Sequence, residues 1–242
     1  MRGPRNAQAH AHALPTTIQA LETPHQVPLM TLRSTVLFPQ AIMPLFIFEP
    51  RYRHMLRAVL AQDRFLAVAA LDERSEQAAS AETPYTTAAI GVVRACQQNP
   101  DGSSHLLLQG LARVQLESVI TDTPYPQARI RRIASEAGGS EAQLAALQRR
   151  LLGLIQTQLR LGADIPQEVI QFLTALQEPE HALDLAIYSL CASATLKQAL
   201  LETRALVPRF QRFEQFLQAE IKRLKLERKL RGGLDDKQIG NN

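Results

Sequence analysis

The pattern of apolar residues changes once along the chain, at Gly138-Gly139. Before this point apolar residues come in short runs bounded by prolines or polar loops, such as LFIF at 45–48 and FLAVAAL at 65–71, which is typical of strands. After it they recur every three or four positions, which indicates amphipathic helices. The sequence therefore predicts an α+β chain: a β-rich part, a Gly-Gly hinge and an α-helical part.

The β-rich part contains one well-marked hairpin and one helix. The runs at 90–98 and 105–120 flank a loop with Pro100-Asp101-Gly102, in which proline presets φ and glycine accepts a positive φ. Pro50 suits the first turn of a helix, because its missing N–H is not needed there. The apolar stripe of that helix is Met55, Leu56, Val59 and Leu60.

The second part reads as a series of helices. Ser140 with Gln143 resembles a capping box, in which a hydroxyl accepts a backbone N–H of the first turn. Three further helices are expected, the last starting near Thr195 with Gln198 at capping-box spacing. A long terminal helix follows Pro208, and its apolar stripe is Phe210, Phe213, Leu217, Ile221 and Leu224.

These patterns divide the chain into four segments. They are a disordered N-terminal arm at 1–26, the β-rich part at 27–135, the helical part at 136–232 and a flexible tail at 233–242. The arm lacks the apolar core of a secretory signal, and no apolar run approaches the roughly 20 residues that span a bilayer. We therefore expect a cytoplasmic protein without a membrane span, with an organellar presequence as the alternative for the arm.

The positive charge lies near the C-terminus. The formal net charge is +4, and the run KRLKLERKLR at 222–231 holds six basic residues and one acidic residue. It can be a solvated helix face, a docking surface for a second copy or a partner, or a nucleic-acid contact. No aromatic residue interrupts the run to stack on bases. The candidate residues are Lys222, Arg223, Lys225, Arg228 and Lys229.

The common catalytic signatures are absent from the sequence. There is no GxxxxGK[ST] phosphate loop, no GxSxG nucleophile elbow and no HExxH zinc motif. The six histidines do not cluster at metal-ligand spacing, and Cys96 and Cys191 show no CxxC spacing. We therefore expect no catalytic residues, no metal site, no cofactor and two reduced thiols.

Three stretches resemble one known family. PLMTLRSTVLFPQAIMPLFIFEPRY at 28–52 is similar to the opening of the N-terminal domain of Lon proteases. The resemblance continues through IGVVRACQQNPDGSSHLLLQGLARVQL at 90–116 and LLETRALVPRFQRFEQFLQAEIKRLKLERKLRG at 200–232. In all it covers roughly residues 27–235, in the family's order. It implies a PUA-like pseudobarrel followed by a helical bundle.

The same resemblance implies a role in substrate recognition. In full-length Lon this domain holds substrate proteins and helps to assemble the hexamer, upstream of an AAA+ ATPase and a protease with a Ser–Lys dyad. Neither module has a counterpart up to Asn242, so the resemblance implies a stand-alone, non-catalytic domain. We expect it to capture unfolded or peptide-like segments as an accessory to ATP-dependent proteolysis or quality control, with a full-length Lon-type protease as a partner.

Candidate peptide-binding residues surround the second strand and the first helix. The alternative for the apolar ones is core packing, and for the arginines it is local ion pairing at the helix end with Glu49. Rival functions are an RNA- or DNA-associated protein that uses the basic helix, and a small-ligand pocket between the two parts. The candidates are Met43, Phe46, Phe48, Arg51, Tyr52 and Arg53.

Overall fold

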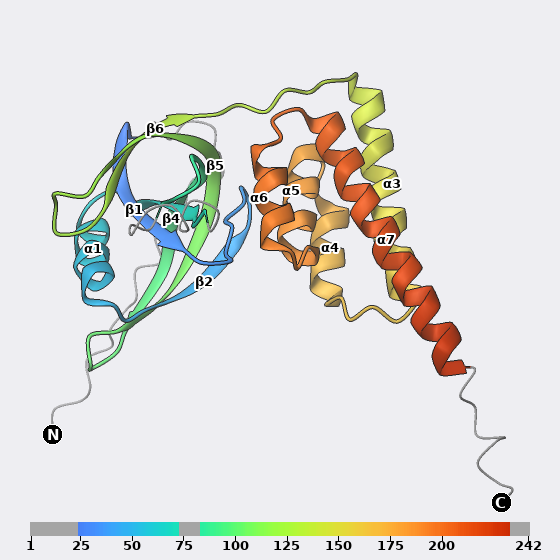
Figure 1. Cartoon of the computed structure of the whole chain (residues 1–242), viewed down its shortest axis with the longest axis horizontal. Helices are drawn as coiled ribbons and strands as arrows, with labels where there is room; N and C mark the ends of the chain where they lie inside the picture. Colours follow the sequence, from blue (N-terminus) through green and yellow to red (C-terminus); the bar gives the residue numbers. More distant parts are fainter. Residues whose placement is uncertain (1–23, 73–82, 233–242) are drawn as a thin grey trace, which may run out of the picture.

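The computed structural model describes residues 24–72 and 83–232 of the protein (Figure 1). Six strands and one helix come first in this part of the chain and five helices follow, so the predicted β-then-α order is confirmed. We call residues 26–132 the sheet half and residues 141–232 the helical half. Residues 1–23 of the predicted disordered arm lie outside the described residues, as does the predicted flexible tail at 233–242.

The strands form a single sheet in the order β2-β5-β4-β3-β1-β6, and β6 also pairs with β5. β1 and β3 run parallel, and the connection between them contains β2 and α1 (Pro50–Ala61). Since β5 pairs with β2 near one end and with β6 near the other, five strands close a circuit and β2 stays at the edge. The strands are β1 (Gln26–Leu32), β2 (Ile42–Ile47), β3 (Phe65–Ala70), β4 (Thr87–Gln98), β5 (Ser104–Ile120) and β6 (Gln127–Arg132).

The β4–β5 hairpin turns at the predicted Pro-Asp-Gly sequence. The Asp101 carboxylate accepts hydrogen bonds from the backbone N–H of Ser103 at 2.9 Å and from its hydroxyl at 2.6 Å. Gly102 has a φ of 80°, a conformation that glycine adopts without a steric penalty. The turn fixes a register in which Gln97 lies opposite His105.

Apolar side chains pack on both faces of the central strands. β3 is buried along its whole length, as its short apolar run predicted. One face is covered by α1, which contributes the buried residues Tyr52, Met55, Leu56 and Val59. The other face lies inside the strand circuit and includes Val27, Leu29, Phe65, Ile90, Val114, Leu116 and Ile130.

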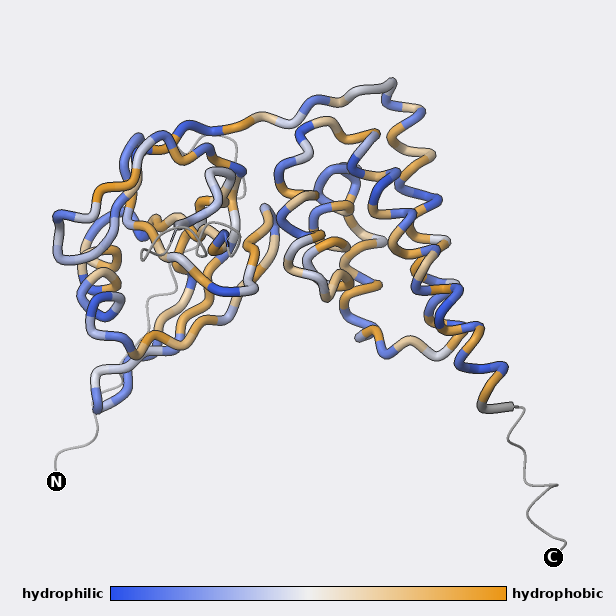
Figure 2. The backbone as a smooth tube through the Cα atoms, viewed as in Figure 1, coloured by the Kyte–Doolittle hydropathy of each residue, from blue (hydrophilic) through white to orange (hydrophobic). Residues whose placement is uncertain are grey.

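The helical half is a bundle in which α3 and α7 lie side by side (Figure 1). Hydrophobic residues recur along both helices (Figure 2). α7 begins at Leu206, two residues before Pro208. The proline therefore lies in the first turn, where its missing N–H is not needed for a helical hydrogen bond. The helices are α3 (Glu141–Arg160), α4 (Gln167–Ala175), α5 (Pro179–Leu190), α6 (Ala194–Glu202) and α7 (Leu206–Gly232). Of the predicted α7 stripe, Phe210, Phe213, Leu217 and Ile221 are buried, whereas Leu224 is half-buried.

Two helix starts show how local chemistry sets the boundaries. Ser140 is the N-cap of α3, and its hydroxyl accepts the backbone N–H of Gln143 at 3.2 Å, as predicted. The start of α6 near Thr195 is confirmed, but its predicted cap is wrong. The cap is Ser193, which accepts the N–H three residues further on, and Gln198 lies buried within the helix.

The two halves meet at a buried group of charged side chains, which we call the junction cluster. Arg113 of β5 donates two hydrogen bonds to the Asp184 carboxylate of α5, at 2.8 and 2.5 Å. Arg209, in the first turns of α7, donates to the same carboxylate at 3.1 Å. Glu180 accepts from Arg113 at 3.1 Å and also from the Ser135 hydroxyl. Two cations therefore face two anions across the junction.

The junction cluster is almost free of water contact at its centre. Asp184 and Arg209 are 0% exposed and Arg113 is 3% exposed. The Nε groups of the two arginines donate to the backbone carbonyls of Leu201 and Thr203, at 3.2 and 2.7 Å. Burial of a charge is costly unless it is paired and hydrogen-bonded, and this network supplies both. It ties β5 to α5, α6 and α7.

We expect Asp184→Asn to lower the free energy of unfolding by about 3–5 kcal/mol, because it leaves two buried guanidinium groups with only the partly exposed Glu180 as an anion. Urea unfolding followed by circular dichroism measures the loss. The matched control is Arg223→Gln, which removes an exposed ion pair on α7 and should cost about 1 kcal/mol or less. Equal losses in the two variants would contradict the role given to the cluster.

The acid stability of the protein should depend on Glu180. Burial raises the pKa of this carboxyl, but the Ser135 hydrogen bond and the charges of Arg113 and Arg209 outweigh burial, so the pKa lies below the ordinary value of 4.5. Such a group stabilises the fold fully above its unfolded pKa, and the contribution is lost as the pH falls through its folded pKa.

We therefore expect the melting temperature of the wild type to fall more steeply than that of Glu180→Gln between about pH 5 and about pH 3. Thermal melts followed by circular dichroism test this. Parallel curves for the two proteins would show that Glu180 titrates alike in the folded and unfolded states.

Candidate functional site

Exposed aromatic residues gather at the C-terminal end of β2. Phe46 is 50% exposed and Phe48 is 61% exposed. Their rings stack with centroids 5.8 Å apart, and the Phe46 ring also stacks on His105 at 4.7 Å. Grouped large apolar side chains in contact with water mark an interaction surface more often than isolated ones do.

Two of the predicted peptide-binding candidates are core residues and not surface residues. Met43 is 2% exposed and packs beneath the strand. Tyr52, on α1, is 4% exposed, and its hydroxyl donates to the backbone carbonyl of Thr31 at 3.2 Å. Both side chains therefore belong to the core of the sheet half, and the surface around Phe46 contains neither of them.

The surface around Phe46 extends over three adjacent strands. Pro44 lies opposite Leu107, which lies opposite Ala95; in the next row Phe46, His105 and Gln97 are aligned. All six residues are exposed on one face of the sheet and line a hollow of about 450 Å³. We call this surface the outer face: Pro44, Phe46, Ala95, Gln97, His105 and Leu107.

Sequence reasoning missed the β4 and β5 members of the outer face. The available signal was the hairpin turn, since it sets the register that places His105 opposite Gln97. The second signal was the β2–β5 pairing, which brings Phe46 opposite His105. That pairing joins segments far apart in the chain, and no local pattern specifies it.

β2 is an edge strand whose free edge is short of hydrogen-bond donors. The Ile42 carbonyl accepts from the Tyr188 hydroxyl at 3.3 Å, so it points away from β5. By alternation, the backbone groups of Pro44 and Phe46 point the same way. Proline has no N–H, so an added strand would lose a ladder bond at Pro44. The outer face therefore presents mainly side chains to a partner.

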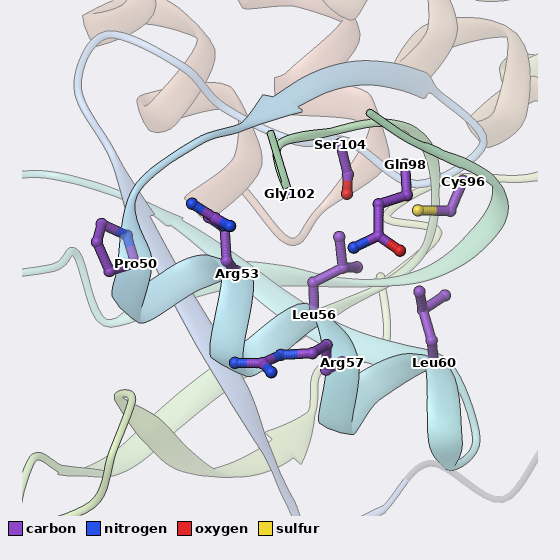
Figure 3. Close-up of a pocket in the computed structure, with 9 residues that line it drawn as sticks. All are labelled: Pro50, Arg53, Leu56, Arg57, Leu60, Cys96, Gln98, Gly102 and Ser104. Carbon is purple, nitrogen blue, oxygen red and sulfur yellow. The ribbon is translucent and has the colours of Figure 1, made fainter. Parts of the chain in front are cut away.

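The two predicted arginines lie in different surroundings. Arg51 pairs with Glu49 at 3.1 Å, and its guanidinium lies 4.7 Å from the centroid of the Tyr52 ring. The predicted local ion pair at this helix end is therefore present. Arg53 lines a separate cavity of about 230 Å³ between α1 and the β4–β5 hairpin (Figure 3).

The basic residues at 222–229 lie on the last turns of α7, which extend beyond the rest of the bundle (Figure 1). Arg223 pairs with Glu220 at 2.8 Å and with Glu227 at 2.5 Å. These acids offset part of the charge on which a phosphate contact would depend. Two exposed leucines, Leu226 and Leu230, lie among the cations. The remaining exposed cations are Lys222, Lys225, Arg228 and Lys229.

Residues 24–72 and 83–232 contain no group of three His, Cys, Asp or Glu side chains placed to hold a metal ion. In the same part of the chain, no helix has the length and apolar character needed to cross a bilayer. Cys96 and Cys191 are free thiols, the first half-buried and the second buried.

Known proteins match this chain over most of its length. The family model of the ATP-dependent protease La (LON) substrate-binding domain matches residues 26–219. The Lon proteases of Heliobacterium modesticaldum and Geobacter metallireducens are each 27% identical to it, over 209 and 213 residues. The alignments cover 86% and 88% of this chain, but 26% of each relative. The chain thus spans about a quarter of the length of these curated relatives.

A solved structure has a similar fold. It is the N-terminal domain of Mycobacterium avium complex Lon protease, with a TM-score of 0.61 and 18% sequence identity. The match covers 81% of this chain and 98% of that domain. At this identity the similarity concerns the fold, including the order of a sheet half and a helical half.

Truncation of two β2 residues on opposite faces of the strand should separate core from surface. We expect Met43→Ala to lower the free energy of unfolding by about 2–5 kcal/mol, because it leaves a cavity beneath the sheet. Phe46→Ala should cost about 1 kcal/mol or less, because half of the side chain is already exposed. Urea unfolding of both variants measures the difference, and equal losses would place Phe46 in the core.

Proposed function

The chain belongs to the ATP-dependent protease La (LON) substrate-binding domain family, and we propose that it binds unfolded or peptide-like segments of other proteins on its outer face. The role is binding without catalysis. The held segment is passed to a Lon-type protease, as an accessory step of ATP-dependent proteolysis in the cytoplasm.

The exposed aromatic stack of Phe46, Phe48 and His105 is the observation that supports this function most directly. Aromatic rings bury a large area with few rotatable bonds, so they bind apolar side chains of many shapes at a small entropic cost. An unfolded chain exposes such side chains, whereas a folded protein buries them.

The shortage of hydrogen-bond donors at the free edge of β2 supports recognition through side chains. A full added strand would read the backbone of a segment by a ladder of hydrogen bonds. Pro44 lacks the donor that such a ladder needs, and the Ile42 carbonyl is already bonded to Tyr188. A segment held by apolar contacts over a shallow hollow is bound with low sequence specificity, as a substrate-binding domain with varied clients requires.

We expect the double variant Phe46→Ser, Phe48→Ser to bind an unfolded protein at least about tenfold more weakly than the wild type, because it removes the central aromatic contacts. The probe is fluorescein-labelled, reduced and carboxymethylated lactalbumin, which stays unfolded in native buffer. Fluorescence anisotropy gives the dissociation constant.

The matched control is Phe172→Ser. Phe172 is 67% exposed on α4 in the helical half, so its loss removes an exposed phenyl ring away from the outer face. Binding by this control should equal that of the wild type. The function proposed for the outer face is wrong if the double variant binds as tightly as the control.

A further inference from the structure

A second cavity lies on the opposite side of the β4–β5 hairpin from the outer face. We call it the arginine pocket, because Arg53 and Arg57 line it from successive turns of α1. Gln98 and Ser104 line it from the hairpin, and Leu56 forms an apolar wall. Figure 3 shows Arg53 reaching from α1 toward the turn, and the polar ends of Gln98 and Ser104 on the hairpin side of the cavity.

Asp101 of the hairpin turn interacts electrostatically with Arg53, but no ion pair joins the two side chains, so the positive charge of the arginine pocket is only partly offset. Elsewhere in the sheet half, Arg51 pairs with Glu49 and Arg131 with Glu117, each within 3.2 Å. Among the described residues, neither Arg53 nor Arg57 has a carboxylate within ion-pair distance, and neither guanidinium has a hydrogen-bond partner. Two guanidinium groups four residues apart on a helix repel each other, so an anion between them is favourable.

The polar atoms of the pocket are held by the fold. Ser104 is only 5% exposed, and its position is fixed by pairing with Ile47 and Gln98 on the neighbouring strands. Arg53 packs directly on the turn: a Cβ atom at Gly102 would lie 1.9 Å from its Nη2 atom. The lack of a side chain at Gly102 therefore leaves room for the Arg53 guanidinium, in addition to permitting the turn.

The outer face and the arginine pocket are one residue apart along both strands of the hairpin. His105 and Gln97 point to the outer face, while Ser104 and Gln98 point to the pocket. Neighbouring residues of a strand are about 3.3 Å apart and face opposite sides. The hairpin tip lies at an end of the sheet half away from the helical half (Figure 1), so a bound chain can pass around it.

We propose that the arginine pocket binds the carboxylate of an acidic residue in the segment that the outer face holds. The inference rests on the function proposed above and names its preferred clients: segments in which Asp or Glu lies close to aromatic or aliphatic residues. A guanidinium group donates two parallel hydrogen bonds to a carboxylate, and Ser104 and Gln98 provide further donors. The apolar wall at Leu56 strengthens these bonds by excluding water.

The test uses pairs of fluorescein-labelled peptides. A single glutamate is moved along an otherwise uncharged, aromatic-rich sequence, and each peptide has a counterpart with glutamine at the same position. We expect at least one glutamate peptide to bind the wild type about tenfold more tightly than its counterpart. Raised salt should reduce this preference, because the guanidinium groups are partly exposed to solvent.

Two double variants separate a specific site from general charge. Arg53→Gln, Arg57→Gln should abolish the preference for glutamate and leave the affinity for the glutamine peptides unchanged. Arg149→Gln, Arg212→Gln removes the same charge from exposed positions in the helical half and should keep the preference. Melting curves of both variants confirm that each is folded.

Three other results would overturn the inference. Equal binding of glutamate and glutamine peptides leaves the outer face as the peptide site and removes the arginine pocket from it. Equal loss of the preference in both double variants shows that only net charge matters. If no peptide binds, the proposed function fails as well, and calorimetric titration with inorganic phosphate shows whether the pocket takes a free anion instead.

Discussion

Arg113 lies on a strand of the sheet half, but its neutralising carboxylate comes from the helical half, and the arrangement of the two halves depends on this pairing. A guanidinium that is 3% exposed cannot remain unpaired, so β5 and α5 must meet where Asp184 lies. Arg209 adds a second cation and shares the same anion. The same strand links the junction cluster to the outer face, because the start of β5 presents His105 there.

Strand alternation assigns neighbouring residues to different tasks. In β2, Met43 and Ile47 fill the core while Pro44 and Phe46 face outward. The hairpin repeats this division one residue at a time, so that a short stretch of chain serves two cavities. The β5 part of the outer face rests directly on the packed layer beneath it, since His105 and Leu107 each lie between buried residues.

Local chemistry predicted much of the fold. The Pro-Asp-Gly turn, the Ser140 cap and the buried run of β3 were each read from a few adjacent residues whose preferences agree with the structure. The cap of α6 was misplaced because Ser193 and Thr195 are both residue types that favour the N-cap, and in the structure the Ser193 hydroxyl accepts the first-turn N–H of Leu196. Three features depend on contacts between distant segments, which periodicity does not encode. They are the strand register, the Arg113–Asp184 pair and the division of the predicted site residues between core and surface.

The first and last strands of the sheet half are neighbours, and this ordering has a kinetic consequence. Gln26 of β1 and Gln127 of β6 are 101 residues apart in the chain and hydrogen-bond at 2.7 Å. The strand circuit therefore closes only after all its members have been synthesised, and loop closure over that length slows its formation. The helices form from local contacts and need no such search. All members of the slow half are thus synthesised before the helical half emerges, and Arg113 can meet its carboxylate partner only after α5 has followed.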